Sequence, residues 1–165
     1  MNLISEKNFK QFYIENFAAV RVFIYAKCND PALAEDIAQE AFVRLWNNKE
    51  KVPVEKAKSF VFTVSGNLFL DHARHQKVKN NYKNGFEMRY EGDNPHFLVE
   101  MEEFKIKLEA TIQSMPEGAR EVFLLNRMEK MTYNQIAESL GLSVKAIEKR
   151  MQKALEIMAT LKLKK

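Results

Sequence analysis

Cationic side chains recur towards the end of the chain at the spacing of one helix face. Long cations reach phosphates, and Arg or Lys can also bond the base edges of guanine. The candidates on the exposed face of this helix are Ser143, Lys145, Ala146, Lys149, Arg150 and Lys153. Taken alone, the pattern fits either a nucleic-acid contact or the solvated basic face of a plain helical hairpin.

The residues before this helix favour a DNA-binding helix-turn-helix. The stretch 132–135 (TYNQ) has the pattern of a capping box at the start of a first helix. Gly141 has the place of a left-handed C-cap, and Ser143 can cap the second helix. Small Ala137 lets the two helices cross closely, and Ile147 would fill the space between them. In such motifs the second helix enters the major groove of DNA.

A polar and acidic patch is expected earlier in the chain. Asp36, Gln39 and Glu40 stand at i, i+3 and i+4, so they share one helix face. This face lies beside the apolar stripe of the same helix. It could dock a basic partner surface, or it could be an ordinary solvated face.

A third group lies on the following helix. Asn67, Asp71 and Arg74 stand at i, i+4 and i+7, and Asp71 with Arg74 could form a simple ion pair within the helix. His72 and His75 are one turn apart, but a zinc site normally needs three or four ligands. The sequence also has no glycine-rich phosphate loop and no nucleophile elbow. We therefore expect no metal, no cofactor and no enzyme activity.

Helices must position these residues. The chain has 165 residues, of which only five are Gly and four are Pro, so a turn-rich β-sandwich or barrel is disfavoured. Apolar periodicity and caps predict helices over 6–27, 31–48, 55–77, 101–114, 116–128, 133–140 and 144–161. We predict an all-α fold with two small helical domains joined by a flexible acidic linker. The expected ranges are 5–77 for the first domain, 78–100 for the linker and 101–165 for the second domain.

Charge is distributed unevenly, although the net charge is only +4. Residues 72–86 and 141–165 are basic, whereas 87–109 is acidic. The single cysteine, Cys28, cannot form an internal disulfide, which indicates a reducing cytoplasm. The N-terminus is polar, and no apolar run approaches the length of a membrane span, so we expect no membrane insertion.

Four motifs, taken in order, resemble segments of the extracytoplasmic-function (ECF) sigma factors of the sigma-70 family. They are 34–46 (AEDIAQEAFVRLW), 67–74 (NLFLDHAR), 115–123 (MPEGAREVF) and the helix-turn-helix at 132–155. Together they cover most of the chain from about residue 9 to residue 161. The resemblance implies a protein that binds core RNA polymerase and directs it to promoter DNA, and it implies regulation by an anti-sigma factor.

The resemblance also assigns roles to residues. Core polymerase binding falls to Asp36, Gln39, Glu40 and Arg44. Binding of the minus-ten element falls to Asn67, Asp71, Arg74, Lys77, Lys79 and Asn80. Binding of the minus-thirty-five element falls to Ser143, Lys145, Ala146, Lys149, Arg150 and Lys153. The acidic linker would thread the polymerase's template and RNA-exit path, or serve only as a flexible connection.

Two departures from the family and one rival function stay open. Glu148 stands where the family commonly has Lys, so it could face inward or select against some DNA sequences. Gly66 lies inside a predicted helix at a cost of about 1 kcal/mol relative to Ala, which predicts close helix packing there. The rival is a helix-turn-helix activator or repressor that binds duplex DNA without serving as a polymerase subunit.

Overall fold

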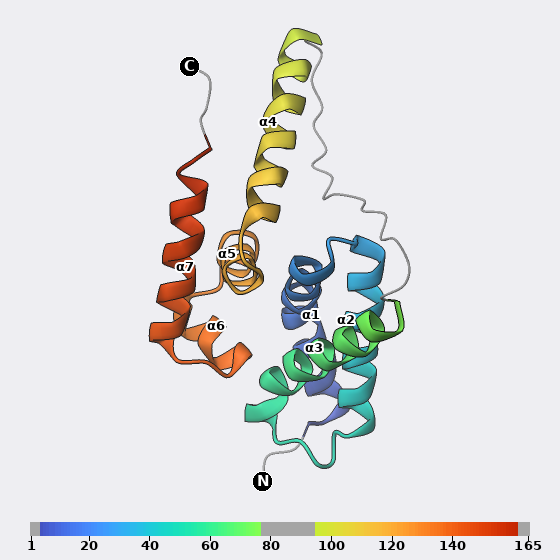
Figure 1. Ribbon diagram of the computed structural model, residues 1–165. Helices are drawn as coiled ribbons and strands as arrows, with labels where there is room; N and C mark the ends of the chain where they lie inside the picture. Colours follow the sequence, from blue (N-terminus) through green and yellow to red (C-terminus); the bar gives the residue numbers. More distant parts are fainter. Residues whose placement is uncertain (1–3, 77–94, 162–165) are drawn as a thin grey trace.

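The computed structural model describes residues 4–76 and 95–161 of the chain, and these residues form helices (Figure 1). The elements are α1 (Glu6–Cys28), α2 (Pro31–Asn47), a short 3-10 helix η1 (Val54–Lys56), α3 (Ala57–Gln76), α4 (Pro95–Ser114), α5 (Glu117–Glu129), α6 (Tyr133–Leu140) and α7 (Val144–Met158). No β-strand occurs in the two described stretches. The predicted all-α class is confirmed.

The helix ends follow the predicted capping residues. The Asp30 carboxylate accepts hydrogen bonds from the backbone N–H groups of Ala32 and Leu33, at 3.1 and 3.3 Å, and so caps α2. Thr132 forms a capping box with Gln135 at the start of α6. Gly141 ends that helix in the left-handed conformation, with φ of 70°. These local signals were sufficient to fix where α2 and α6 begin and where α6 ends.

Other boundaries differ from the sequence-based expectation. α4 begins at Pro95 rather than at residue 101, inside the stretch predicted as linker. Proline suits the first turn of a helix because the N–H it lacks would have no partner there. α7 ends at Met158 rather than at residue 161. Residues 78–94, the rest of the predicted linker, lie outside the described residues.

α1 lies at the centre of the molecule. Its consecutive residues from Val22 to Ala26 are all buried, whereas a helix with one apolar stripe would expose part of such a run. α2 and α3 pack against one side of α1, and α5 packs against another. The two halves of the chain therefore share one hydrophobic core rather than forming two separate ones.

Aromatic rings hold α1 against α2. Phe42 of α2 is buried and contacts four rings of α1, which belong to Phe9, Phe12, Tyr13 and Phe17. Trp46 extends this cluster, because its ring centroid lies 5.0 Å from that of Phe9. Such pairs add specific edge-to-face contacts to the burial of apolar area. The helix that carries the predicted acidic patch is thereby held in a fixed orientation.

Gly66 does not have the role expected of it. A Cβ atom added there would lie 3.9 Å from Cε2 of Phe23, which is an ordinary van der Waals distance. No neighbouring helix approaches closely enough to require glycine, so the expectation of close packing at this position is wrong. An alanine would fit without displacing α1.

Candidate nucleic-acid interface

The helix-turn-helix has the geometry expected from the sequence. Ile147 and Ala154 are fully buried and Met151 is 1% exposed, so one side of α7 is fixed against α5 and α6. Ile147 fills the position predicted for it between the helices. The Ser143 hydroxyl accepts a hydrogen bond of 3.1 Å from the backbone N–H of Ala146 and caps α7. These contacts determine which residues of α7 face solvent.

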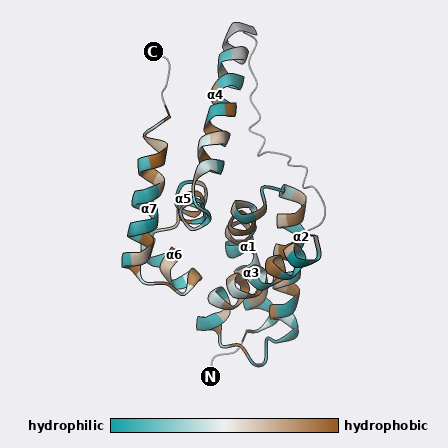
Figure 2. Cartoon of the chain, in the orientation of Figure 1, coloured by the Kyte–Doolittle hydropathy of each residue, from teal (hydrophilic) through white to brown (hydrophobic). Residues whose placement is uncertain are grey.

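The outward side of α7 carries most of the predicted cations. Lys145, Lys149 and Lys153 are exposed, as is Ser143, and Ala146 is half-buried. Figure 2 shows hydrophilic and hydrophobic segments alternating along α7, as expected for a helix with one buried and one solvated side. A row of lysines on a rigid helix can contact successive phosphates.

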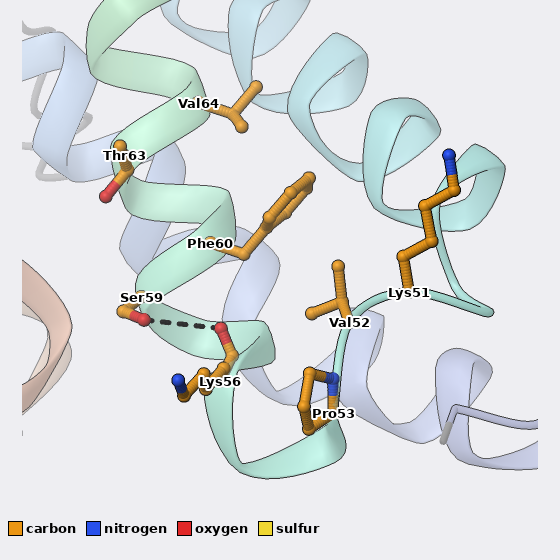
Figure 3. A pocket seen from close by; sticks show the side chains of 8 residues that line it. All are labelled: Lys51, Val52, Pro53, Lys56, Ser59, Phe60, Thr63 and Val64. Carbon is orange, nitrogen blue, oxygen red and sulfur yellow. Dashed lines mark hydrogen bonds between the residues drawn. The ribbon is translucent and has the colours of Figure 1, made fainter. Parts of the chain in front are cut away.

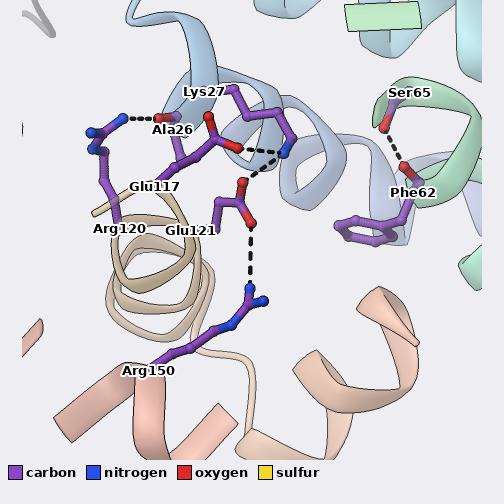
Figure 4. Close-up of polar contacts among 8 residues, drawn as sticks. All are labelled: Ala26, Lys27, Phe62, Ser65, Glu117, Arg120, Glu121 and Arg150. Atoms are coloured by element: carbon purple, nitrogen blue, oxygen red, sulfur yellow. Dashed lines mark hydrogen bonds and ion pairs between the residues drawn. The ribbon is translucent and has the colours of Figure 1, made fainter. Parts of the chain in front are cut away.

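Arg150 is placed differently from these lysines. Its guanidinium turns towards α5, where Nη1 lies 3.9 Å from Oε1 of the buried Glu121 (Figure 4). The same group lies over Gly118, since a Cβ atom there would be 3.0 Å from Nη1. Arg150 is therefore half-buried at the edge of the lysine row. Sequence spacing placed it on the correct helix but could not reveal a partner on another helix.

The predicted residues of α3 lie on its exposed side. Asn67, Asp71 and Arg74 are all exposed, and Nη1 of Arg74 is 3.4 Å from Oδ1 of Asp71. The ion pair considered from the sequence is thus present. Lys77, Lys79 and Asn80 lie outside the described residues.

A pocket at the start of α3 was missed by the sequence reasoning. It has a volume of about 410 Å³ and is lined by Lys51, Val52, Pro53, Lys56, Ser59, Phe60, Thr63 and Val64 (Figure 3). Ser59 and Thr63 stand at i and i+4 on α3, and Asn67 follows one turn later. The pocket is therefore continuous with the polar side of α3. The sequence signal that could have indicated the pocket was the pair Val52-Pro53 between Lys51 and Lys56, followed by Phe60.

The polar patch of α2 is exposed as expected. Asp36, Gln39 and Glu40 face solvent, and Nε of Arg44 is 3.3 Å from Oε2 of Glu40. Val43 is 49% exposed on the same side of the helix, and the sequence reasoning had not selected it. The patch thus combines carboxylate and amide groups with one apolar side chain.

Comparisons with known proteins agree with this arrangement. The model of sigma-70 region 2 matches residues 12–78, and the model of sigma-70 region 4 matches residues 105–158. The chain belongs to the sigma-70 family. Relatives that are named ECF RNA polymerase sigma factors support its placement in the extracytoplasmic-function group of that family. The region 2 match includes the α2 patch, the pocket and α3, and the region 4 match includes α5 and the helix-turn-helix.

Two relatives of this sigma factor match over most of their own length. The ferric citrate uptake sigma factor FecI of Escherichia coli is 26% identical over 152 residues, which is 90% of this chain and 87% of FecI. The ECF RNA polymerase sigma factor SigM of Bacillus subtilis is 25% identical over 124 residues, covering 73% of this chain and 74% of SigM.

Solved structures share the fold of this sigma factor. CnrH, solved in complex with the cytosolic domain of CnrY, has a TM-score of 0.62 at 20% identity and covers 95% of this chain and 88% of its own. RpoE, solved in complex with the anti-sigma factor NepR from Bartonella quintana, has a TM-score of 0.66 at 19% identity, covering 94% and 96%.

Polar contacts join the two regions of the sigma factor where α1 meets α5 (Figure 4). Nζ of Lys27 lies 2.6 Å from Oε2 of Glu121 and 3.2 Å from Oε2 of Glu117. Arg120 donates hydrogen bonds to the carbonyl of Ala26 and to carbonyls at the end of α4. Burial raises the pKa of the Glu121 carboxyl above its usual value, and the hydrogen bond from Lys27 partly offsets this effect.

The described residues also bear on a metal site at His72 and His75 and on membrane insertion, both of which were considered from the sequence. Within residues 4–76 and 95–161, no three His, Cys, Asp or Glu side chains are grouped so that they could hold a metal ion. His75 instead places Nδ1 2.7 Å from the carbonyl oxygen of Asp71. Among the described helices, none combines the length and apolar character needed to cross a membrane.

Proposed function

We propose that this sigma factor binds core RNA polymerase through α2 and directs it to promoters that it reads with α3 and α7. The observation that carries the proposal is the order of the two family regions, each of which contains an exposed polar helix face. An isolated helix-turn-helix regulator would need α7 but would have no use for a region 2 fold. The protein acts as an initiation factor without a catalytic site or cofactor of its own.

The polymerase contact is assigned to the exposed side of α2. Asp36, Gln39 and Glu40 offer hydrogen-bond acceptors to a basic partner surface, and Arg44 keeps Glu40 oriented at 3.3 Å. Val43 adds apolar area near the centre of the patch. Protein interfaces commonly surround a small apolar contact with polar groups in this way.

The minus-ten contact is assigned to α3 and to the pocket before it. A base taken out of the stack needs a polar wall and a ring to stack on. Phe60 can supply the ring, Ser59 and Thr63 can supply hydrogen bonds, and Lys51 with Lys56 can hold the adjoining phosphates. The strand would continue along Asn67, Asp71 and Arg74 and then along Lys77, Lys79 and Asn80.

The minus-thirty-five contact is assigned to α7 in the major groove. Lys145, Lys149 and Lys153 face the phosphates, while Ser143 and Ala146 at the start of the helix lie nearest to the base edges. Arg150 would contact the backbone from the edge nearer α5. Phosphate contacts of this kind make the affinity for DNA fall steeply as salt is added.

The partners and location follow from this function. Core polymerase and promoter DNA are the obligate partners, and the site of action is the cytoplasm. An anti-sigma factor is a further partner. Support comes from RpoE, a structural neighbour solved in complex with the anti-sigma factor NepR.

The test is a titration of the labelled protein against purified bacterial core RNA polymerase. We expect core binding that competes with a primary sigma factor and that weakens in the Asp36→Ala/Gln39→Ala double variant. The matched control is Gln152→Ala/Glu156→Ala, which also removes one exposed amide and one exposed carboxylate from a helix, but on α7. Absence of core binding, together with a shift of duplex DNA by the protein alone, would favour the helix-turn-helix regulator instead.

A further inference from the structure

Glu148 is a carboxylate among the lysines of α7. It is exposed, it precedes Lys149 directly, and it lies one turn after Lys145. Among the residues that the structure describes, no cation lies within ion-pair distance of it. The alternative that Glu148 faces inward is therefore wrong. Its charge is available to whatever approaches this side of α7.

The buried residues of α7 fix the direction in which Glu148 points. Successive residues of a helix are rotated by about 100°. Because Ile147 and Met151 face the core, Glu148 and Arg150 lie on opposite flanks of the helix. Arg150 occupies the flank nearer α5, so Glu148 lies on the flank away from Glu121 and Gly118. It belongs to the first half of α7, the part of a recognition helix that reaches base edges.

A carboxylate in the major groove discriminates between bases because it can only accept hydrogen bonds. Cytosine offers the N4 amino donor, which Glu and Asp accept. Guanine offers only the acceptors N7 and O6, and thymine offers O4 and a methyl group, so both leave the charge unpaired. An unpaired charge taken out of water is costly. Adenine also offers an amino donor, at N6, but the acceptor N7 beside it faces the second oxygen of the carboxylate. A glutamate here therefore favours cytosine and penalises guanine and thymine.

We propose that Glu148 is a specificity-determining residue that selects cytosine, and rejects guanine, at one position of the minus-thirty-five element. The inference rests on the proposed function, since it requires α7 to lie in the major groove of promoter DNA. Lys145 and Lys149 offset the repulsion between Glu148 and the phosphates. The acid thus supplies discrimination, while its neighbours supply affinity.

The experiment uses the sigma factor assembled with core RNA polymerase and a promoter library randomised across the minus-thirty-five element. Bound or transcribed sequences are counted for the wild type, Glu148→Ala and Glu148→Gln. We expect the wild type to enrich cytosine at one position by roughly 5- to 10-fold, and Glu148→Ala to lose that enrichment. Glu148→Gln should move the preference towards adenine, because an amide can bond both N6 and N7 of that base.

The matched control is Glu156→Gln, which changes another exposed acid of α7 about two turns further along, beyond the part expected to reach base edges. It should leave the cytosine preference unchanged. A clear minus-thirty-five element whose base preferences are the same in the wild type and in Glu148→Ala would overturn this inference alone. A wild-type holoenzyme that enriches no sequence at this element would overturn the proposed function as well.

Discussion

α5 and α7 are neighbouring helices of the same region with opposite surroundings. α5 lies between α1 and α7, and its buried residues run almost without interruption through Ala119, Glu121, Val122, Phe123, Leu124 and Leu125. α7 buries Ile147, Met151 and Ala154 on one side and exposes its opposite side to solvent. α5 connects the two halves of the molecule, whereas α7 presents cations to solvent.

This difference separates two kinds of substitution. A change at a buried position of α5 removes contacts between helices, so it should alter the stability of the fold and the junction with α1. A change on the outward side of α7 should alter binding while the fold keeps its stability.

Arg120→Ala should be the most damaging change in α5. The guanidinium bonds the carbonyls of Ile112, Gln113 and Met115 as well as that of Ala26, so its loss leaves several partly buried acceptors without their donor. We expect the free energy of unfolding in urea to fall by about 3 kcal/mol. Arg127→Ala, on the exposed side of α5, is the control and should cost less than about 1 kcal/mol. Equal losses in both variants would show that the hydrogen bonds of Arg120 to neighbouring segments add nothing to the stability of the fold.

The free energy of unfolding should depend on pH through the titration of the Glu121 carboxyl. Because burial raises the pKa of this carboxyl, the folded state holds the proton more tightly than the unfolded state does. The contribution of Glu121 is then fully present below the ordinary pKa of a glutamate and is lost as pH rises through the raised value. Glu121→Gln should remove this decline from urea unfolding curves measured between pH 4 and pH 8. Parallel curves for the wild type and the variant would show that Glu121 titrates normally.

Lys149→Ala and Lys153→Ala should act on binding alone. Both lysines are exposed on α7, so the urea midpoint should not move. The affinity of the holoenzyme for promoter DNA should fall, and each substitution should reduce the slope of log affinity against log salt by about one. Equilibrium binding at several salt concentrations measures this slope. A loss of folding stability in either variant would show that α7 is not the free surface described above.

Gly66→Ala should give the smallest change and should be favourable. The new methyl group would make an ordinary contact with Phe23, and the helix interior would gain propensity. We expect the free energy of unfolding to rise by about 0.5–1 kcal/mol. The substitution serves as a reference for the other variants, because Gly66 lies on α3, next to Phe23 of α1, and outside both α5 and α7. A loss of stability would mean that α3 and α1 approach more closely than the structure indicates.

Local features of the sequence predicted most of the helices. Asp30 before Pro31 and the capping box at 132–135 are read within a few residues, and the structure has both. The three exposed groups on α2, α3 and α7 followed from helical periodicity in the same way. Periodicity also placed Ile147 in the core of the helix-turn-helix.

Contacts between distant segments could not be predicted in this way. An apolar stripe indicates that a helix face is buried but not what covers it, so the packing of α5 on α1 was not foreseen. The direction of the Arg150 side chain, towards Glu121, and the pocket around Phe60 could not be predicted for the same reason. Each depends on segments that meet only in the fold. The early start of α4 was missed because the polar composition of the surrounding residues outweighed the signal of Pro95.

The contact between α1 and α5 has a consequence for when the sigma factor can recognise a promoter. The minus-ten and minus-thirty-five elements are about 25 base pairs apart, or about 85 Å of B-form DNA. Since α1 contacts α5 and α3 contacts α6, the proposed assignment of α3 to one element and α7 to the other requires the free chain to separate its two regions first. If the separated form were about 1% of the population, the apparent affinity for a complete promoter would be about 100-fold below its intrinsic value. Core polymerase would then increase promoter affinity by holding the regions apart, without adding a single contact to DNA.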